Sequence, residues 1–250
     1  MPEDIYKSYL LKNASFTGVF ELPTLKGYFG DLPKGVISFP EARKNKNWEP
    51  DNWVHFYVDD DQFQCIWNSP KHYLSLFQRS AGVITPDFSV YFDMPFHLQI
   101  NNVARNRALG HWLEENGVPV IPNVRWGERR TYDFVFAGIP QHSVVAVGSH
   151  GCLKNNDSRF YFVMGLQEMI ARLEPSAIVV VGKAPDSIFA SVRDQGIKVV
   201  NFESQTALFF SNRKKETEAT PKLCKSTNEE RLFIQTDTST TKAPDNISVR

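Results

Sequence analysis

The pattern of hydrophobic and polar positions changes near residue 50. Residues 1–50 are interrupted by glycine and proline at short intervals, as in FELPTLKGYFGDLPKG, and this predicts an irregular N-terminal cap. From Trp53 onward, short apolar runs alternate with amphipathic segments, which predicts strands alternating with helices. The run AIVVVG at 177–182 is apolar throughout, as expected of a strand buried on both faces.

The segment 96–117 shows the most regular helical spacing. Its apolar residues Ile100, Val103, Ala104 and Leu109 fall largely on one side, and Gly117 supplies a stop. Further helices are expected at 69–82, 159–176 and 185–196, and strands or extended runs at 53–60, 83–95, 118–122, 134–140, 143–151 and 197–202.

The alternation of strands and helices, with short connections, predicts an α/β fold over residues 51–210, built on a mostly parallel sheet with crossover helices. About six strands fit an incomplete (β/α)-barrel-like sheet or an open doubly wound sheet, and we favour the barrel-like form. The runs 134–140 and 143–151 look like two strands joined without a helix, so the repeat is imperfect.

The composition also predicts a polar C-terminal tail and a cellular location. Residues 211–250 are rich in Lys, Glu, Thr, Ser and Asn, with Phe233 as their only aromatic residue, and predict a disordered polar tail. The three cysteines are far apart and form no CxxC pair, which favours a reducing, cytoplasmic location without a structural zinc. No apolar run is long enough for a membrane span, and no signal peptide is expected.

Charge narrows the choice of partners only in part. Lys and Arg total 28 and Asp and Glu total 28, so no overall basic field drives non-specific binding to nucleic acid. A local basic patch is still compatible with this balance.

The candidate chemistry lies where the predicted strands end. Ligands of α/β folds bind beyond the carboxyl ends of the strands, because helix N-termini with free N–H groups meet there. These ends carry three aspartates as candidate catalytic residues or metal ligands, namely Asp60, Asp87 and Asp93. They also carry the candidate ligand-binding residues Asn123, Arg125, Trp126, Ser149, His150 and Lys183.

Structural roles compete with these assignments. The run Asp59–Asp61 also suits a turn or helix cap, and Trp126 also suits a plug at the end of a barrel. A carboxylate in an apolar run must be paired, and Arg125 or Arg105 could pair with Asp87 for structure alone. If a metal binds, oxygen ligands favour Mg²⁺ or Mn²⁺; its presence is open.

Cys152, in GSHGC, is a candidate nucleophile, but residues i and i+2 rarely form a Cys–His dyad. We therefore expect Cys152, like Arg105, to support the site from behind the ligand-binding residues. Gly148 and Gly151 instead suggest a turn with open N–H groups that could bind an anion. The chain has no GxxxxGK[ST], GxSxG or HExxH motif.

Several segments, in this order, resemble the bacterial and phage domain-of-unknown-function 4417 family: WVHFYVDDDQF, GVITPDFSVYFDMP, NVARNRALGHWLEENGVPVIPNVRWG, GIPQHSVVAVGSHGC and LEPSAIVVVG. The resemblance covers roughly residues 50–200. It implies a shared architecture, a bacterial cell or phage host, and a mild association with nucleic acid or nucleotides, but no reaction. The positions that it carries over are Asp60, Asp87, Asp93, Asn102, Arg105, Arg107, Asn123, Arg125, Trp126, Gly151, Cys152, Pro175 and Gly182.

Three functions therefore stay open. The chain is an enzyme acting on a nucleotide or nucleic-acid phosphate, a regulatory module that binds a ligand or partner without turnover, or a glycoside hydrolase. In the first reading, Arg125 and Lys183 hold phosphate and Trp126 stacks on a ring.

Overall fold

The computed structural model describes residues 4–45 and 47–204, and the predicted tail at 211–250 lies outside them. One parallel sheet has the strand order β3-β4-β5-β6 and a second has the order β7-β8-β9. A small antiparallel hairpin, β1 and β2, precedes them. The strands are β1 (Phe16–Thr17), β2 (Leu22–Pro23), β3 (Gly35–Ser38), β4 (Asn52–His55), β5 (Gly82–Ile84), β6 (Val120–Ile121), β7 (Val144–Gly148), β8 (Ala177–Val181) and β9 (Lys198–Phe202).

The two parallel sheets are joined at one point, directly after β6. Asn123 forms a parallel bridge with Ala146 of β7. The Val124 N–H donates to the Ala146 carbonyl at 2.8 Å, and the Ala146 N–H donates to the Pro122 carbonyl at 2.8 Å. The strands thus form one curved series from β3 to β9, and no closed barrel forms within the described residues.

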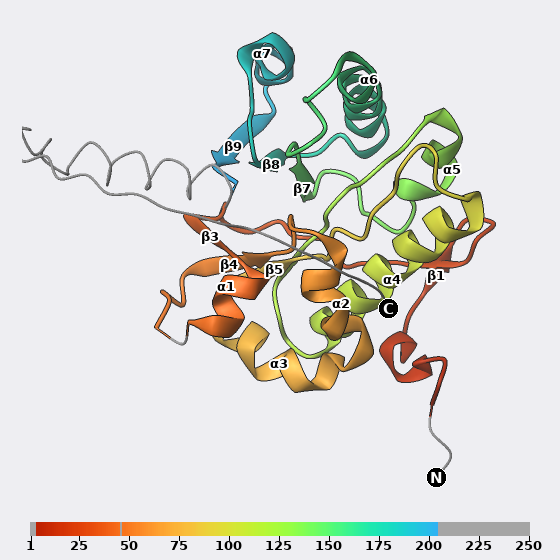
Figure 1. The fold of residues 1–250 in the computed structure, drawn as a ribbon, viewed down its shortest axis with the longest axis vertical. Coiled ribbons are helices and arrows are strands. Elements are labelled where there is room, and N and C mark those ends of the chain that lie inside the picture. The colour runs from red at the N-terminus through yellow and green to blue at the C-terminus, as the bar shows by residue number, and fades with distance from the viewer. Residues whose placement is uncertain (1–3, 46, 205–250) are drawn as a thin grey trace, which may run out of the picture.

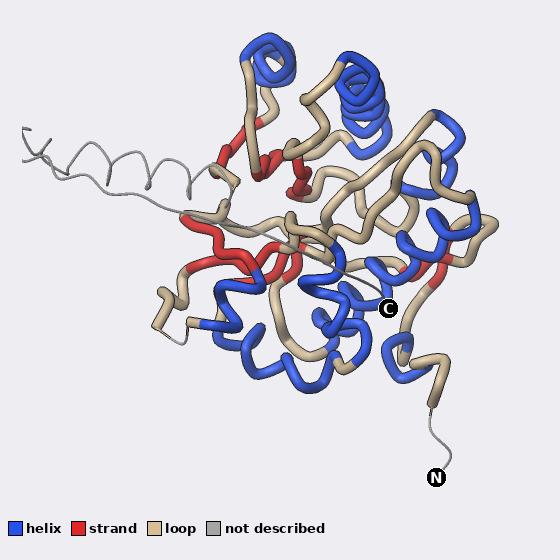
Figure 2. Tube along the Cα trace, in the orientation of Figure 1, coloured by secondary structure: helices blue, strands red, loops and turns tan. Residues whose placement is uncertain are grey.

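Helices cover the outside of this series, and the strands lie between them (Figures 1 and 2). The helices α1, α2 and α3 pack beside the first sheet, and α6 and α7 lie beside the second (Figure 1). The helices are α1 (Phe39–Lys44), α2 (Asp60–Asn68), α3 (Pro70–Arg79), α4 (Phe96–Glu115), α5 (Tyr132–Val135), α6 (Asn156–Leu173) and α7 (Asp186–Asp194). No helix in the described part of the chain is long and apolar enough to cross a bilayer.

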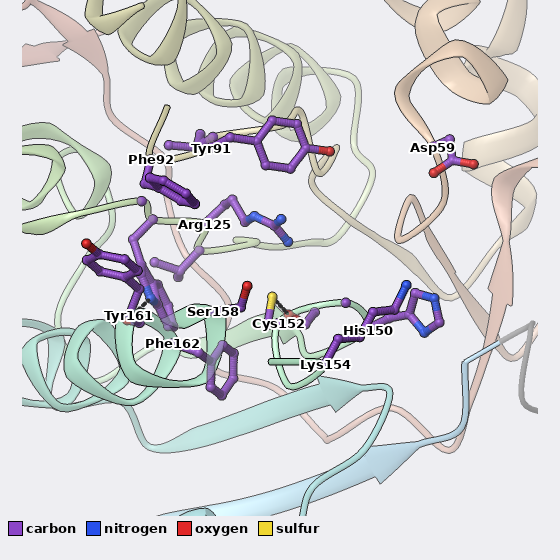
Figure 3. Close-up of a pocket in the computed structure, with 16 residues that line it drawn as sticks. Asp59, Tyr91, Phe92, Arg125, His150, Cys152, Lys154, Ser158, Tyr161 and Phe162 are labelled. Atoms are coloured by element: carbon purple, nitrogen blue, oxygen red, sulfur yellow. Dashed lines mark hydrogen bonds between the residues drawn. The ribbon is translucent and has the colours of Figure 1, made fainter. Parts of the chain in front are cut away.

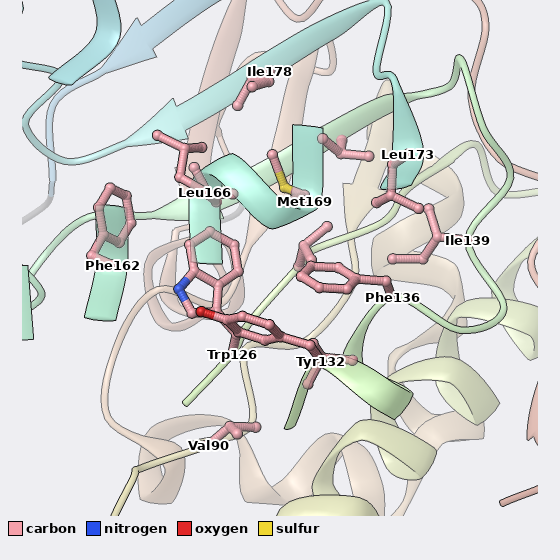
Figure 4. Close-up of a cluster of buried hydrophobic side chains, with 14 of the residues drawn as sticks. Val90, Trp126, Tyr132, Phe136, Ile139, Phe162, Leu166, Met169, Leu173 and Ile178 are labelled. Carbon is pink, nitrogen blue, oxygen red and sulfur yellow. The ribbon is translucent and has the colours of Figure 1, made fainter. Parts of the chain in front are cut away.

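Three apolar clusters hold these layers together. Side chains on the inner face of both sheets, including Trp53, Ile121 and Val179, pack against one another, so the two sheets face each other across this cluster. The outer faces pack on the helices in two larger clusters. The cluster under α6 places Trp126, Phe162 and Met169 together (Figure 4). Burial of this kind contributes about 25 cal/mol per Å² of apolar surface and is the main stabilising contribution.

The predicted α/β class and parallel sheets are correct, and three local predictions need correction. Residues 132–135 form helix α5, although 134–140 was expected to be extended. Residues 83–95 form a strand only up to Ile84, because Pro86 removes an N–H donor. Within residues 1–50, β3 and α1 join the main sheet and core, since Val36 and Phe39 supply apolar side chains amid the glycines and prolines.

Gly165 allows α6 to pack against Trp126. A Cβ at this position would overlap the indole ring, which is itself held among buried side chains. We therefore expect Gly165→Ala to destabilise the protein by about 1–3 kcal/mol through overpacking, although Ala is the better helix former in an open helix by about 1 kcal/mol.

Urea denaturation of the full chain checks this prediction. Met164→Ala is the matched control, since Met164 is exposed on the same helix and should change stability by no more than about 0.5 kcal/mol. A Gly165→Ala protein as stable as the wild type would show that the helix and Trp126 are not in close contact.

Candidate functional site

Two adjoining cavities open at the carboxyl ends of β4 to β7. They have volumes of about 340 Å³ and about 380 Å³, each sufficient for a small ligand. Five residues line both: Asp59, Tyr91, Arg125, Gly148 and His150. Figure 3 shows the first cavity, with the Arg125 guanidinium and the Tyr91 ring reaching toward the space between the two halves of the fold.

A buried network around Asp87 holds Arg125, the member of this network that lines both cavities. The Asp87 carboxylate accepts a hydrogen bond from the Asn123 amide at 2.9 Å and pairs with Arg125 at 3.4 Å. Its side chain is only 11% exposed. Burial raises the pKa of Asp87, and Arg125 and Asn123 partly oppose that rise. For Arg125, burial opposes the charge, but Asp87 and other neighbours outweigh it and raise the pKa.

Asn123 extends this network toward β4. Its Oδ1 accepts a hydrogen bond from the Tyr57 hydroxyl at 3.0 Å, and the backbone N–H of Asn123 donates to the Thr85 hydroxyl at 2.8 Å. Burial, together with the charge of Asp87, raises the pKa of Tyr57 well above its ordinary value, so the phenol stays protonated. Asn123 is therefore a positioning residue here: both halves of its amide are used within the protein.

Asp60, at the start of α2, lines the second cavity with Asp87. Its two oxygens accept hydrogen bonds from the hydroxyl of Ser89 at 2.8 Å and from its backbone N–H at 3.1 Å. Asn102 donates to the Ser89 carbonyl at 2.8 Å and so supports the same loop. Asp93 is exposed and lines neither cavity, so the three aspartates do not share one site.

Three of the predicted ligand-binding residues line neither cavity, namely Asn123, Lys183 and Ser149. Lys183, after β8, is exposed, and it lines neither cavity. Ser149 is 2% exposed and sits against Gly182, where a Cβ would collide with its hydroxyl. His150, which follows Ser149, lines both cavities.

Trp126 lines the first cavity mainly from within the core. It is 8% exposed, and its indole N–H donates to the Tyr161 carbonyl at 3.1 Å. Its ring packs on Phe162 with centroids 5.5 Å apart. The indole therefore fixes the wall of the cavity, and its face is already occupied by protein.

Cys152 also lines the first cavity. Its thiol lies 3.6 Å from the Gly148 carbonyl. Burial raises the pKa of the thiol, while the charge of Arg125 opposes the rise. A thiol with a raised pKa is a weak nucleophile, which agrees with a supporting role.

Arg105 lies behind the second cavity. Its guanidinium stacks 3.9 Å from the centroid of the Phe88 ring and donates to Gln64 at 2.7 Å. Burial lowers the pKa of Arg105 to about 10, and Asp60 opposes this effect. Arg105 thus supports the surroundings of Asp60 and does not line either cavity.

The structure adds lining residues that the sequence did not indicate. Phe92 and Tyr161 stack with centroids 5.5 Å apart and an interplanar angle of 19° at the rim of the first cavity. Lys154 lines that cavity too, and so does Asp59, from the run Asp59–Asp61 that the sequence had already indicated (Figure 3). Phe92 lies in VYFDMP, near the end of the extended run predicted at 83–95, but its pairing with α6 is a tertiary contact.

The described residues offer no assembled metal centre. No group of three or more His, Cys, Asp or Glu side chains is placed to hold a metal ion in residues 4–45 and 47–204. Of the candidate ligands for Mg²⁺ or Mn²⁺, Asp60 and Asp87 accept hydrogen bonds from Ser89 and Asn123, and Asp93 is exposed apart from them.

Removal of Arg125 tests the Asp87 network. At neutral pH we expect Arg125→Met to destabilise the protein by about 3 kcal/mol, because it leaves a buried carboxylate without its cation. In that variant the folded pKa of Asp87 lies further above its ordinary value of 3.8. Asp87 then holds a proton in the folded state at pH values where the unfolded chain has lost it, so the penalty shrinks as the pH falls toward about 4.

Urea denaturation between pH 4 and pH 8 measures this, as a difference from the wild type. The double variant Arg125→Met with Asp87→Asn is the control, and it should recover most of the lost stability. A penalty for Arg125→Met that is the same across this pH range, or that survives in the double variant, would contradict the pairing.

Comparison with known proteins identifies a family and two similar phage proteins. Residues 14–203 match the family described as Domain of unknown function (DUF4417). The Gene 1 protein of Mycobacterium phage L5 is 36% identical over 169 residues, covering 67% of this chain and 73% of the phage protein. The Gene 1 protein of Mycobacterium phage D29 is 35% identical over 130 residues, covering 52% of this chain and 48% of the phage protein. The chain thus aligns with about half of the D29 protein's length, and no solved structure matches it significantly.

Proposed function

We propose that this chain, which belongs to the phage-associated family described as Domain of unknown function (DUF4417), binds a nucleotide in the two adjoining cavities. The observation that carries the proposal is the position of Arg125, which lines both cavities and has one pairing with Asp87. Its other guanidinium N–H groups make no hydrogen bond to the described residues. A fixed guanidinium with spare donors suits a phosphate group.

A second cation supports a phosphate in the first cavity. Lys154 lines it together with Arg125, the His150 imidazole lines it too, and the one carboxylate in its lining is Asp59. Phosphate oxygens accept hydrogen bonds and carry negative charge, so a phosphate is favoured on this side. The second cavity, lined by Asp59, Asp60 and Asp87, disfavours a second phosphate by like-charge repulsion.

Aromatic side chains at the rim supply a surface for the base. Phe92 is 50% exposed and Tyr91 is 51% exposed, and both line the first cavity. Large exposed aromatic rings are costly to leave in water, and each stacked base is worth about 1–3 kcal/mol. Phe92, held against Tyr161, takes the stacking role that the sequence suggested for Trp126.

The lining of the first cavity supports binding of a nucleotide. If the protein also catalyses a reaction, the catalytic residues would come from the second cavity. Asp60 and Asp87, with Asp59, are the carboxylates that would face a bound ligand there. A glycoside hydrolase would require an acid and a base on either side of a sugar. Asp87 is tied to Arg125 and the Trp126 ring is covered by protein, so the geometry favours a nucleotide over a sugar.

Calorimetric titration of the full chain with adenosine 5′-monophosphate tests the proposal. We expect Phe92→Ala to weaken binding roughly tenfold through lost stacking, and Lys154→Ala to weaken it roughly fivefold through lost attraction to the phosphate. Adenosine and inorganic phosphate should each bind more weakly than the monophosphate, since each fills one part of the site.

Lys183→Ala is the matched control, because Lys183 is an exposed lysine that lines neither cavity. The Lys183→Ala protein should bind adenosine 5′-monophosphate with the same affinity as the wild type. Failure of the nucleotide to bind, or equal losses in Lys154→Ala and Lys183→Ala, would overturn the proposal. A short single-stranded oligonucleotide that binds while the monophosphate does not would shift the ligand to a nucleic-acid end.

A further inference from the structure

Arg107, in the middle of α4, is a buried cation that the candidate site does not use. It is 1% exposed. Its Nε donates to the Ala137 carbonyl at 3.0 Å, one Nη donates to the Val135 carbonyl at 2.6 Å, and the other donates to the Asn106 side chain. All three acceptors are neutral. Burying a charge without a counter-charge costs several kcal/mol, so a negative charge near Arg107 would stabilise the protein.

The charges around the middle of α4, near Arg105 and Arg107, do not balance. Arg125 pairs with Asp87, and Arg105 has Asp60 as its charged neighbour. The pKa of Arg107 is shifted by burial alone, which lowers it to about 9, so Arg107 stays charged at neutral pH. Three arginines thus share two carboxylates in this part of the described structure, and one positive charge is left uncompensated.

A small cavity adjoins this unpaired cation. Its volume is about 10 Å³, which is roughly the space for one water molecule, so an ion that replaces this water has to be monatomic. The polar groups that line it belong to Asn102, Asn106, Arg107, Asn123 and Arg125, and no carboxylate does. Phosphate, sulfate and organic acids are too large for this volume.

The lining is rich in hydrogen-bond donors. A guanidinium has five N–H groups, and Arg107 uses three of them in the bonds given above. Arg125 uses one, on Asp87. An occupant that only accepts hydrogen bonds and carries one negative charge matches both the spare donors and the missing charge.

We propose that this cavity binds a chloride ion between Arg107 and Arg125. The ion neutralises the charge of Arg107. It also contacts Arg125, which lines both this small cavity and the two larger ones, and so holds that side chain in place. The site is structural and does not depend on the nature of the ligand in those cavities.

Thermal unfolding of the full chain in sodium chloride and in sodium gluconate, each at about 0.15 M, tests the proposal at equal ionic strength. Gluconate is too large for the cavity. We expect a Tm roughly 3–6 °C higher in chloride, because a ligand of the folded state alone stabilises it by mass action. In Arg107→Met this difference should vanish, while in Arg129→Met, which removes an exposed arginine, it should persist.

Crystals grown in sodium bromide give a second measurement on the wild-type chain, which decides the matter if Arg107→Met does not fold. An anomalous bromide peak between Arg107 and Arg125 supports the proposal. Equal Tm values in the two salts, or a water molecule in the cavity without anomalous signal, would overturn it.

Discussion

The parallel bridge between Asn123 and Ala146 joins the two sheets and also locates the candidate site. Backbone hydrogen bonds on either side of Asn123 hold β6 and β7 together, where the strand series would otherwise break into four strands and three. The Asn123 side chain, at the same point, binds Tyr57 and Asp87. One residue therefore connects the fold to the wall of the cavities, and neither is independent of the other.

The open form of the strand series explains why a site exists here. Large side chains such as Trp53 and Ile121 fill the interior between the sheets, but beyond the strand ends the lining becomes polar. A buried carboxylate at this point requires a cation, and Arg125 supplies it while keeping other donors free. The cost of burying Asp87 is thus offset by the same guanidinium that faces the cavities.

Some of this site could be predicted from the sequence, for physical reasons. Asp87 follows an apolar run, so it had to be buried and paired, and the next strand ended in Asn123 and Arg125. Lys183 follows β8 just as closely and yet is exposed, and Asp93, which lies well beyond the end of β5, is exposed too. Phe92 meets Tyr161 only through the docking of α6, which no local pattern encodes, and Lys154, just before α6, lines the same cavity. The strand β3 was hidden by its glycine- and proline-rich surroundings, and only its partner β4 defines it as a strand.

The central claim is that Arg125 holds the anionic group of a nucleotide where the two cavities meet. A crystal structure of the full chain with adenosine 5′-monophosphate tests it most directly. The account predicts a phosphate oxygen within hydrogen-bonding distance of the Arg125 guanidinium and the base against Phe92. A nucleotide bound elsewhere on the chain, with both cavities holding only water, would contradict it.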